Sequence, residues 1–318
     1  MILIVLLLIT LILLLSPAAQ AERYATGLTG AGLLLALCSI WQPSLLSGFP
    51  GLRFDATGRL LSAVVCFVSL AIQAYSLRHF DGQRSKRRAF QYFTALTVTL
   101  ILFSTADHLL LMAGSLLASN LLLTRLIGLN ARWEAAQASA RSALLHLGAG
   151  ALLLTAAALL VYLLQGHLSL RALDTSALTS GTASLLGALV VLAALAQSAI
   201  WPFHRWLIAS ANAPTPVSAF MHAGLVNGGA LILYKFHPLW QLLSWSQLLL
   251  VLLGGLAVAF GFQMWVSLAG ICWIPWITRQ GATWGLAAGL LAVIFTESFG
   301  LQILSAIGIE VWGRWPLT

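Results

Sequence analysis

Charged residues are scarce in this chain, which has 8 acidic and 16 basic side chains among 318 residues. Soluble domains carry about 25% charged residues, whereas this sequence carries 8% and is 60% hydrophobic, with a mean hydropathy of +0.95. So few charges cannot surround an apolar core with a polar surface, and disorder would need a less hydrophobic composition. The composition therefore excludes a water-soluble globule and a disordered chain, and it indicates a membrane protein.

Cysteine is rare as well, and Cys38, Cys66 and Cys272 lie in apolar stretches at unrelated spacings. They match neither a disulfide framework nor a zinc or iron–sulfur motif. The sequence also has no Gly-x-Gly-x-x-Gly loop, Walker loop or His-Glu-x-x-His motif. We therefore predict no cofactor, no metal site and no catalytic residues in this chain.

Basic residues gather in the short gaps between apolar runs. Residues 78–88 contain five bases and Asp81, and a second group lies between Arg125 and Arg141. Such clusters mark cytoplasmic loops rather than a nucleic acid interface. We expect a bacterial inner-membrane protein, and counting bases in alternate loops of such a protein predicts that its N-terminus is periplasmic.

Apolar runs of about 20 residues, the length that crosses a bilayer, recur along the chain. They predict about ten transmembrane helices, near 1–18, 25–42, 60–77, 89–106, 108–129, 142–164, 180–200, 215–235, 247–269 and 283–304. The fold is expected to be an all-α polytopic membrane protein. The first run ends in an Ala-x-Ala sequence that is typical of signal-peptidase sites, but no basic segment precedes it, and we interpret it as a membrane helix.

Residues 196–238 differ most from a generic membrane helix. Pro202 removes a backbone donor, so we predict that helix 180–200 breaks there. Broken helices of this kind line ion and substrate pathways in transporters. Pro214 and Pro216 suit the start of the next helix, with Pro216 in its first turn.

Polar side chains at membrane depth are candidates for an ion pathway. His222 lies about a turn and a half into the predicted helix 215–235, where it could relay a proton or form a neutral interhelical hydrogen bond. The pathway candidates are His222, Gln197, His204, Arg205, Asn227, His146, Asp107, His108 and Glu297.

Several candidates have a structural alternative. His204 and Arg205, which lie between two tryptophans, could anchor a helix in the headgroup region. Asp107 and His108 could cap helix 108–129 or line a hydrated entrance. Lys235 is expected to extend toward the interface at the end of its helix.

The motifs near the break resemble a known family. The run from Pro214 through Ala219 and on to His222 is similar to the helix after the break in antiporter-like membrane subunits of respiratory complex I and Mrp antiporters. Residues 106–112 resemble the helix that enters the same repeat. The resemblance implies N-terminal helices at 1–84, an antiporter-like five-helix repeat at 85–238 and divergent C-terminal helices at 239–318.

The chain departs from the family pattern in two respects. Complex I-like members place an embedded Glu and a Lys at positions that align with Leu117 and Gln197 here. A second inverted repeat is expected to be short or missing, because only two long apolar runs follow Pro238. Glu297 is the acid deep in that region. It could act as a relay carboxylate, or it could form a hydrogen bond with Ser298 or other nearby polar groups.

The sequences of residues 201–207 and 222–229 most resemble those of the DabB subunits of inorganic carbon uptake complexes. That resemblance implies a transporter subunit that translocates protons or sodium, with His222 as the central relay. Its partner would be a DabA-like peripheral subunit, which carries the zinc and the CO2 hydration chemistry. Two alternatives stay open: a proton-pumping subunit of an NADH–quinone oxidoreductase or membrane hydrogenase, and a non-conducting membrane anchor.

Overall fold

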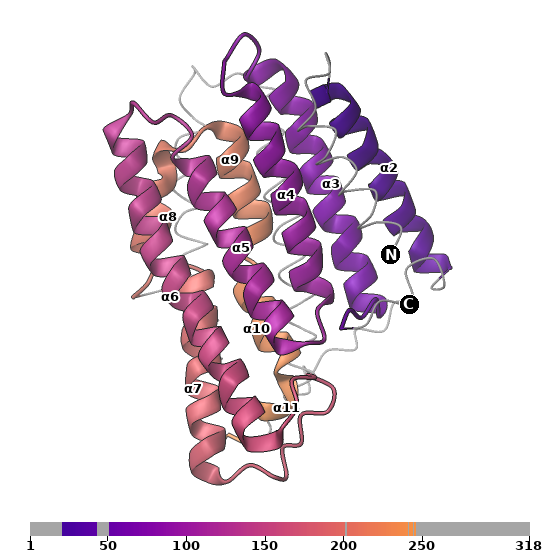
Figure 1. The fold of residues 1–318 in the computed structure, drawn as a ribbon, viewed down its shortest axis with the longest axis vertical. Coiled ribbons are helices and arrows are strands. Elements are labelled where there is room, and N and C mark those ends of the chain that lie inside the picture. The colour runs from indigo at the N-terminus through magenta and orange to yellow at the C-terminus, as the bar shows by residue number, and fades with distance from the viewer. Residues whose placement is uncertain (1–20, 43–50, 201, 241, 244, 246–318) are drawn as a thin grey trace, which may run out of the picture. The chain divides into compact units, whose positions relative to one another are not determined.

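The computed structural model describes residues 21–42, 51–200, 202–240, 242–243 and 245. In these residues every regular element is helical, and six segments are long and apolar enough to cross a membrane (Figure 1). They are α2 (Ala21–Trp41), α3 (Ala56–His79), α5 (Leu109–Ile127), α6 (Glu134–Gln165), α7 (Ser180–Gln197) and the span Thr215–Lys235. The prediction of a helical membrane protein is confirmed for this part of the chain.

The chain divides into two compact units, Met1–Lys235 and Phe236–Thr318. All the spans above belong to the first unit, and the short α11 (His237–Trp240) belongs to the second. The predicted spans 1–18, 247–269 and 283–304 and the candidate Glu297 lie outside the described residues.

The helix α4 (Lys86–Thr105) packs between α3 and α5 (Figure 1). It is rich in hydroxyl side chains, and more than half of its residues are buried. Thr97 and Thr105 donate to carbonyl oxygens one turn earlier in the same helix, at 2.8 and 2.7 Å. Because α4 faces protein rather than lipid along much of its surface, these hydroxyls replace the apolar side chains that a lipid-facing helix needs.

A buried polar seam joins α2, α3 and α4. Gln73 accepts from the hydroxyl of Thr29 at 3.3 Å and donates to Ser69 at 3.0 Å, and Ser69 shares a 2.6 Å hydrogen bond with Thr97. All four side chains are fully buried. Hydrogen bonds between small polar residues are a common way for membrane helices to associate, since apolar surfaces gain little by leaving lipid.

The predicted break at Pro202 is displaced: α7 already ends at Gln197. Ala199 has a left-handed conformation with φ of 52°, and the N–H of Ile200 donates to the carbonyl of Leu195 at 3.1 Å. A left-handed residue followed by this hydrogen bond is a common way to end a helix. Pro202 lies in the connection beyond, so the backbone turn, and not the proline, ends α7.

Two short elements follow the break, α8 (Arg205–Ala209) and the 3-10 turn η2 (Ser210–Asn212). Trp206 is fully buried and donates its indole N–H to the carbonyl of Ala196 at 3.2 Å. The indole N–H therefore satisfies a carbonyl that the end of α7 leaves without a helical partner, and the ring packs inside the protein.

The span Thr215–Lys235 is interrupted too, which the sequence did not predict. It consists of α9 (Thr215–Phe220), the π-helical segment η3 (Met221–Leu225) and α10 (Gly228–Lys235). The N–H of Val226 donates to the carbonyl of Met221, five residues earlier, at 3.1 Å. At the start of α9, the predicted roles are confirmed, since Pro214 is the N-cap and Pro216 lies in the first turn.

Candidate functional site

The two interrupted helices meet at a buried pair of amide side chains. Gln197, the last residue of α7, and Asn120 of α5 are each 1% exposed. Asn120 donates to the Oε1 atom of Gln197 at 3.1 Å, and Gln197 donates to the Oδ1 atom of Asn120 at 3.3 Å. We refer to Asn120 and Gln197 as the amide pair.

The remaining donors of the amide pair are used by backbone carbonyls. Asn120 donates to Leu147 of α6 at 3.1 Å, and Gln197 donates to Leu225 at the end of η3 at 3.1 Å. Each amide has two N–H groups, so every N–H of the pair has an acceptor. A neutral pair therefore connects α5, α6, α7 and η3 without any charged group.

Backbone carbonyls at the interruption in the span Thr215–Lys235 accept hydrogen bonds from side chains at the end of α7. Ser198 donates to the carbonyl of Val226 at 2.9 Å, beside the bond from Gln197 to Leu225. Both carbonyls lie where η3 gives way to α10, so the regular helical hydrogen-bond pattern is interrupted there. Such π-segments are frequent at functional sites, and exposed backbone at membrane depth must be met by protein or water.

A glycine pair lets α10 lie directly against α7. A Cβ atom on Gly229 would collide with the carbonyl oxygen of Ala194 and the hydroxyl of Ser198. On Gly228, it would lie 3.2 Å from the Cγ atom of Gln197. The close approach of the two helices at the amide pair therefore depends on the absence of side chains at these positions.

Among the predicted pathway residues, Gln197 is the one that joins the amide pair in the described structure. His222 is exposed on η3 and forms no hydrogen bond with another described residue. Asn227 donates to Ala223 one turn earlier, at 3.3 Å. The Nδ1 atom of His146 contacts the carbonyl of Ser142 of its own helix, at 2.8 Å. The roles of His146 and His222 in an ion pathway stay predictions.

The other two candidates near the break lie at the start of α8. His204 is partly buried, and its Nδ1 atom has no partner among the described residues, while Arg205 is exposed. Neither side chain forms a hydrogen bond with the amide pair.

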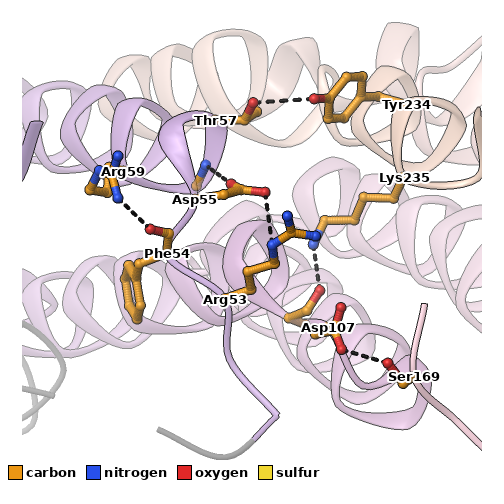
Figure 2. Close-up of polar contacts among 11 residues, drawn as sticks. Arg53, Phe54, Asp55, Thr57, Arg59, Asp107, Ser169, Tyr234 and Lys235 are labelled. Atoms are coloured by element: carbon orange, nitrogen blue, oxygen red, sulfur yellow. Dashed lines mark hydrogen bonds and ion pairs between the residues drawn. The ribbon is translucent and has the colours of Figure 1, made fainter. Parts of the chain in front are cut away.

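A second polar group lies at the end of α4 farther from residues 78–88. It consists of Arg53, Asp55, Asp107 and Lys235, which we call the end cluster (Figure 2). Arg53 forms an ion pair with Asp55 at 3.4 Å, and Lys235 donates to the carbonyl of Ala106 at 2.5 Å. Lys235 is also close enough to both carboxylates to interact with their charges. Lys235 therefore turns into the protein, whereas the sequence suggested that it would extend toward the interface.

Hydrogen bonds to two distant segments of the chain hold the backbone of Asp107 in place. Its backbone N–H donates to Gly51 at 3.0 Å, and its carbonyl accepts from Leu170 at 2.9 Å. Its carboxylate accepts from the hydroxyl of Ser169 at 2.7 Å (Figure 2). The capping role considered for Asp107 is wrong, because His108 occupies the N-cap position of α5 and no side chain caps that helix.

We expect Lys235→Leu to lower the free energy of unfolding by about 2 kcal/mol, because it removes a cation that interacts with Asp55 and Asp107 and leaves the carbonyl of Ala106 without its donor. Lys235→Arg keeps the charge and should cost less than half as much. Thermal unfolding of the purified chain in detergent measures both. Equal losses for the two variants would show that the charge is unimportant.

The sequence held weak signals for the residues that it did not single out. Asn120 is the one amide in the apolar run Leu109–Ile127, and amides at membrane depth usually bond across helices. Arg53 and Asp55 read as ordinary loop residues, since nothing local shows that Lys235 lies beside them.

Comparison with known proteins identifies the family. A family model described as NADH:quinone oxidoreductase/Mrp antiporter, TM, matches residues 106–267, just over half of the chain. The chain belongs to this family. The matched region includes the amide pair, Asp107 and Lys235.

Several proteins to which the chain is similar are named as transporter subunits. The protein named probable inorganic carbon transporter subunit DabB of Bacillus subtilis strain 168 is 34% identical over 75% of this chain and 48% of its own length. The Bacillus anthracis protein of the same name is 32% identical over 66% of this chain and 42% of its own length. The chain thus spans less than half the length of these relatives.

The fold has a solved counterpart. The structure of the Mrp complex from Dietzia sp. DQ12-45-1b matches with a TM-score of 0.65 and 23% identity, over 76% of this chain and 29% of the other. At this identity the match supports the antiporter-like fold.

Proposed function

We propose that this chain is a cation-translocating membrane subunit of an energy-coupled inorganic carbon uptake complex. The observation that carries the proposal is the amide pair where two interrupted helices meet, in a chain whose relatives are named inorganic carbon transporter subunits. The complex I-like Glu and Lys positions align with Leu117 and Gln197 here, which favours this function over that of a complex I pump.

In the proposed mechanism, the interruption between η3 and α10 provides neutral carbonyl oxygens that can accept hydrogen bonds. The side chains of Gln197 and Ser198 donate to the carbonyls of Leu225 and Val226, and water that replaces those side chains could solvate a proton or sodium at membrane depth. His222 lies on the same π-segment, and histidine is the side chain whose unperturbed pKa lies nearest to neutral pH. The ion path would therefore combine a titratable residue on η3 with exchangeable hydrogen bonds at the break.

The proposed partner is a DabA-like peripheral subunit that carries zinc. Affinity purification of this chain from its native membrane should recover that partner, with zinc detected by metal analysis. Recovery of flavin or iron–sulfur subunits instead would favour the alternative, a pump subunit of a membrane hydrogenase or of an NADH–quinone oxidoreductase, the second of which the family description names.

A non-conducting anchor is the other alternative, and the uncharged side chains Leu117 and Gln197 favour it. Cation flux into liposomes that contain this chain and its partner distinguishes the two. Flux above that of partner-only liposomes supports translocation, and no flux with a correctly assembled complex supports the anchor.

The proposed orientation follows the distribution of bases. The 78–88 end of α4 should face the cytoplasm of a bacterial cell and the end cluster the periplasm, with the N-terminus also periplasmic. In a variant whose three native cysteines are replaced by serine, a cysteine introduced at Arg84 should then react with an impermeant thiol reagent only after the membrane is opened.

We expect His222→Ala to abolish partner-dependent growth at ambient CO2 without changing the amount of protein in the membrane, because the η3 segment loses its titratable group. The control is His79→Ala, at the end of α3 and away from the break. Normal growth of the His222 variant would exclude a proton relay through this residue while leaving sodium translocation as a possibility to test by flux.

A further inference from the structure

A charged cleft lies at one end of the helical bundle, the end that contains residues 78–88. It has a volume of 860 Å³ and lies between the first turn of α2, the last turns of α3 and the start of α4. The polar and aromatic residues that line it are Glu22, Arg23, Tyr75, Arg78, Asp81 and Lys86. None of them takes part in the amide pair or the end cluster.

Two of these charges neutralise each other. Lys86 forms an ion pair with Asp81 at 2.9 Å, and this hydrogen bond lowers the pKa of the Asp81 carboxyl, so the carboxylate stays charged. Neither Arg23 nor Arg78 forms a side-chain hydrogen bond or ion pair with a described residue, and both are exposed. With Glu22 as the remaining acid, the cleft keeps a net positive charge.

The surroundings add to that charge. Arg84 and Arg88 are exposed on the adjoining loop and helix start. Clusters of four to eight bases beside a membrane helix attract anionic lipid, at about 1 kcal/mol for each base near the surface. Two guanidinium groups that form no hydrogen bond or ion pair with a described residue also match the several acceptor oxygens of a phosphate.

The cleft has an apolar wall as well as charged groups. Ala74, Tyr75 and Leu77 of α3 line it, and Tyr75 is 53% exposed, as expected for an aromatic ring at the membrane interface. Residues 1–20 contain no charged side chain, so that segment cannot neutralise the two arginines. A ligand that fits both features has an anionic head and an apolar tail.

We propose that this cleft binds the headgroup of an anionic glycerophospholipid, with its phosphate between Arg23 and Arg78 and its acyl chains along the outer face of α3. Neither the family membership nor the proposed transport function requires this site.

Native mass spectrometry of the full chain in detergent tests the proposal, with phosphatidylglycerol and phosphatidylcholine as probes. The unmodified chain should bind phosphatidylglycerol preferentially. Each arginine should contribute about fivefold to that preference, so the double variant Arg23→Gln with Arg78→Gln should lower it about 25-fold. The matched control is Arg125→Gln with Arg132→Gln, which removes two exposed bases from the same end of the bundle, outside the cleft.

Unchanged lipid preference in the Arg23 and Arg78 double variant would overturn the site. An equal loss in the control pair would also overturn it, because the preference would then reflect total charge. Displacement of the lipid by an equal concentration of glycerol 3-phosphate would assign the cleft to a soluble phosphate instead. Size-exclusion profiles that match the unmodified chain confirm that each variant is folded.

Discussion

Replacing Gly229 by alanine is expected to destabilise the protein by about 3 kcal/mol, a cost typical of strong overpacking. The new Cβ atom would overlap the carbonyl oxygen of Ala194, which is backbone and cannot rotate away. The helix α10 must then move off α7. That movement would break the bonds from Gln197 to Leu225 and from Ser198 to Val226, so transport should be lost as well.

The matched control is Gly148→Ala in the middle of α6, where no described atom beyond the adjoining residues and backbone of its own helix lies within 4 Å of the added Cβ. Alanine favours a helix over glycine by about 0.5–1 kcal/mol, so this variant should be as stable as the original chain or slightly more stable. Thermal unfolding in detergent compares the two directly. If Gly229→Ala unfolded at the same temperature as Gly148→Ala, the close contact of α7 and α10 would not matter for stability.

The amide pair should behave as one unit in a double-mutant cycle. Asn120→Ala and Gln197→Ala each leave a buried amide without its partner, at a cost of about 2 kcal/mol for the unsatisfied groups. The double variant removes both amides, so its loss should fall short of the sum of the single losses by about 1–2 kcal/mol. The free energies of unfolding of the four proteins give this coupling.

Asn212→Ala is the control for this cycle. Asn212 also donates from its side chain, to Ser139 at 3.2 Å, but it is only partly buried and lies in η2. Its loss should be below 1 kcal/mol, and the effects of Asn212→Ala and Gln197→Ala should add. Full additivity between Asn120→Ala and Gln197→Ala would mean that the amide pair does not act as a unit.

The long helices could be predicted because lipid imposes a length and a composition on each span. Apolar runs near 60–77 and 180–200 became α3 and α7 within a few residues. The start of α6 was predicted at 142, but the helix begins at Glu134. Its first turns contain Arg141 and other polar residues that lower the hydropathy, yet they are rich in alanine, which favours helix whatever the solvent.

The site was harder to predict, because it depends on contacts between distant segments. Gln197 and Asn120 are 77 residues apart, and no local pattern shows that their side chains meet. The interruption at η3 was missed for a similar reason, since Met221–Leu225 is apolar apart from His222 and a π-segment has no strong sequence signal. The prolines drew attention to the right region, but the backbone turn at Ala199 could not be read from them.

The neutrality of the amide pair has a consequence for the response to membrane voltage. Moving one elementary charge across the bilayer changes the free energy by about 2.3 kcal/mol per 100 mV. Separating Asn120 from Gln197 displaces no net charge, so this rearrangement should occur equally readily in energised and de-energised membranes. Any electrical work in the transport cycle would then be done by the cation alone, and the break could open and close at the same rate whatever the potential.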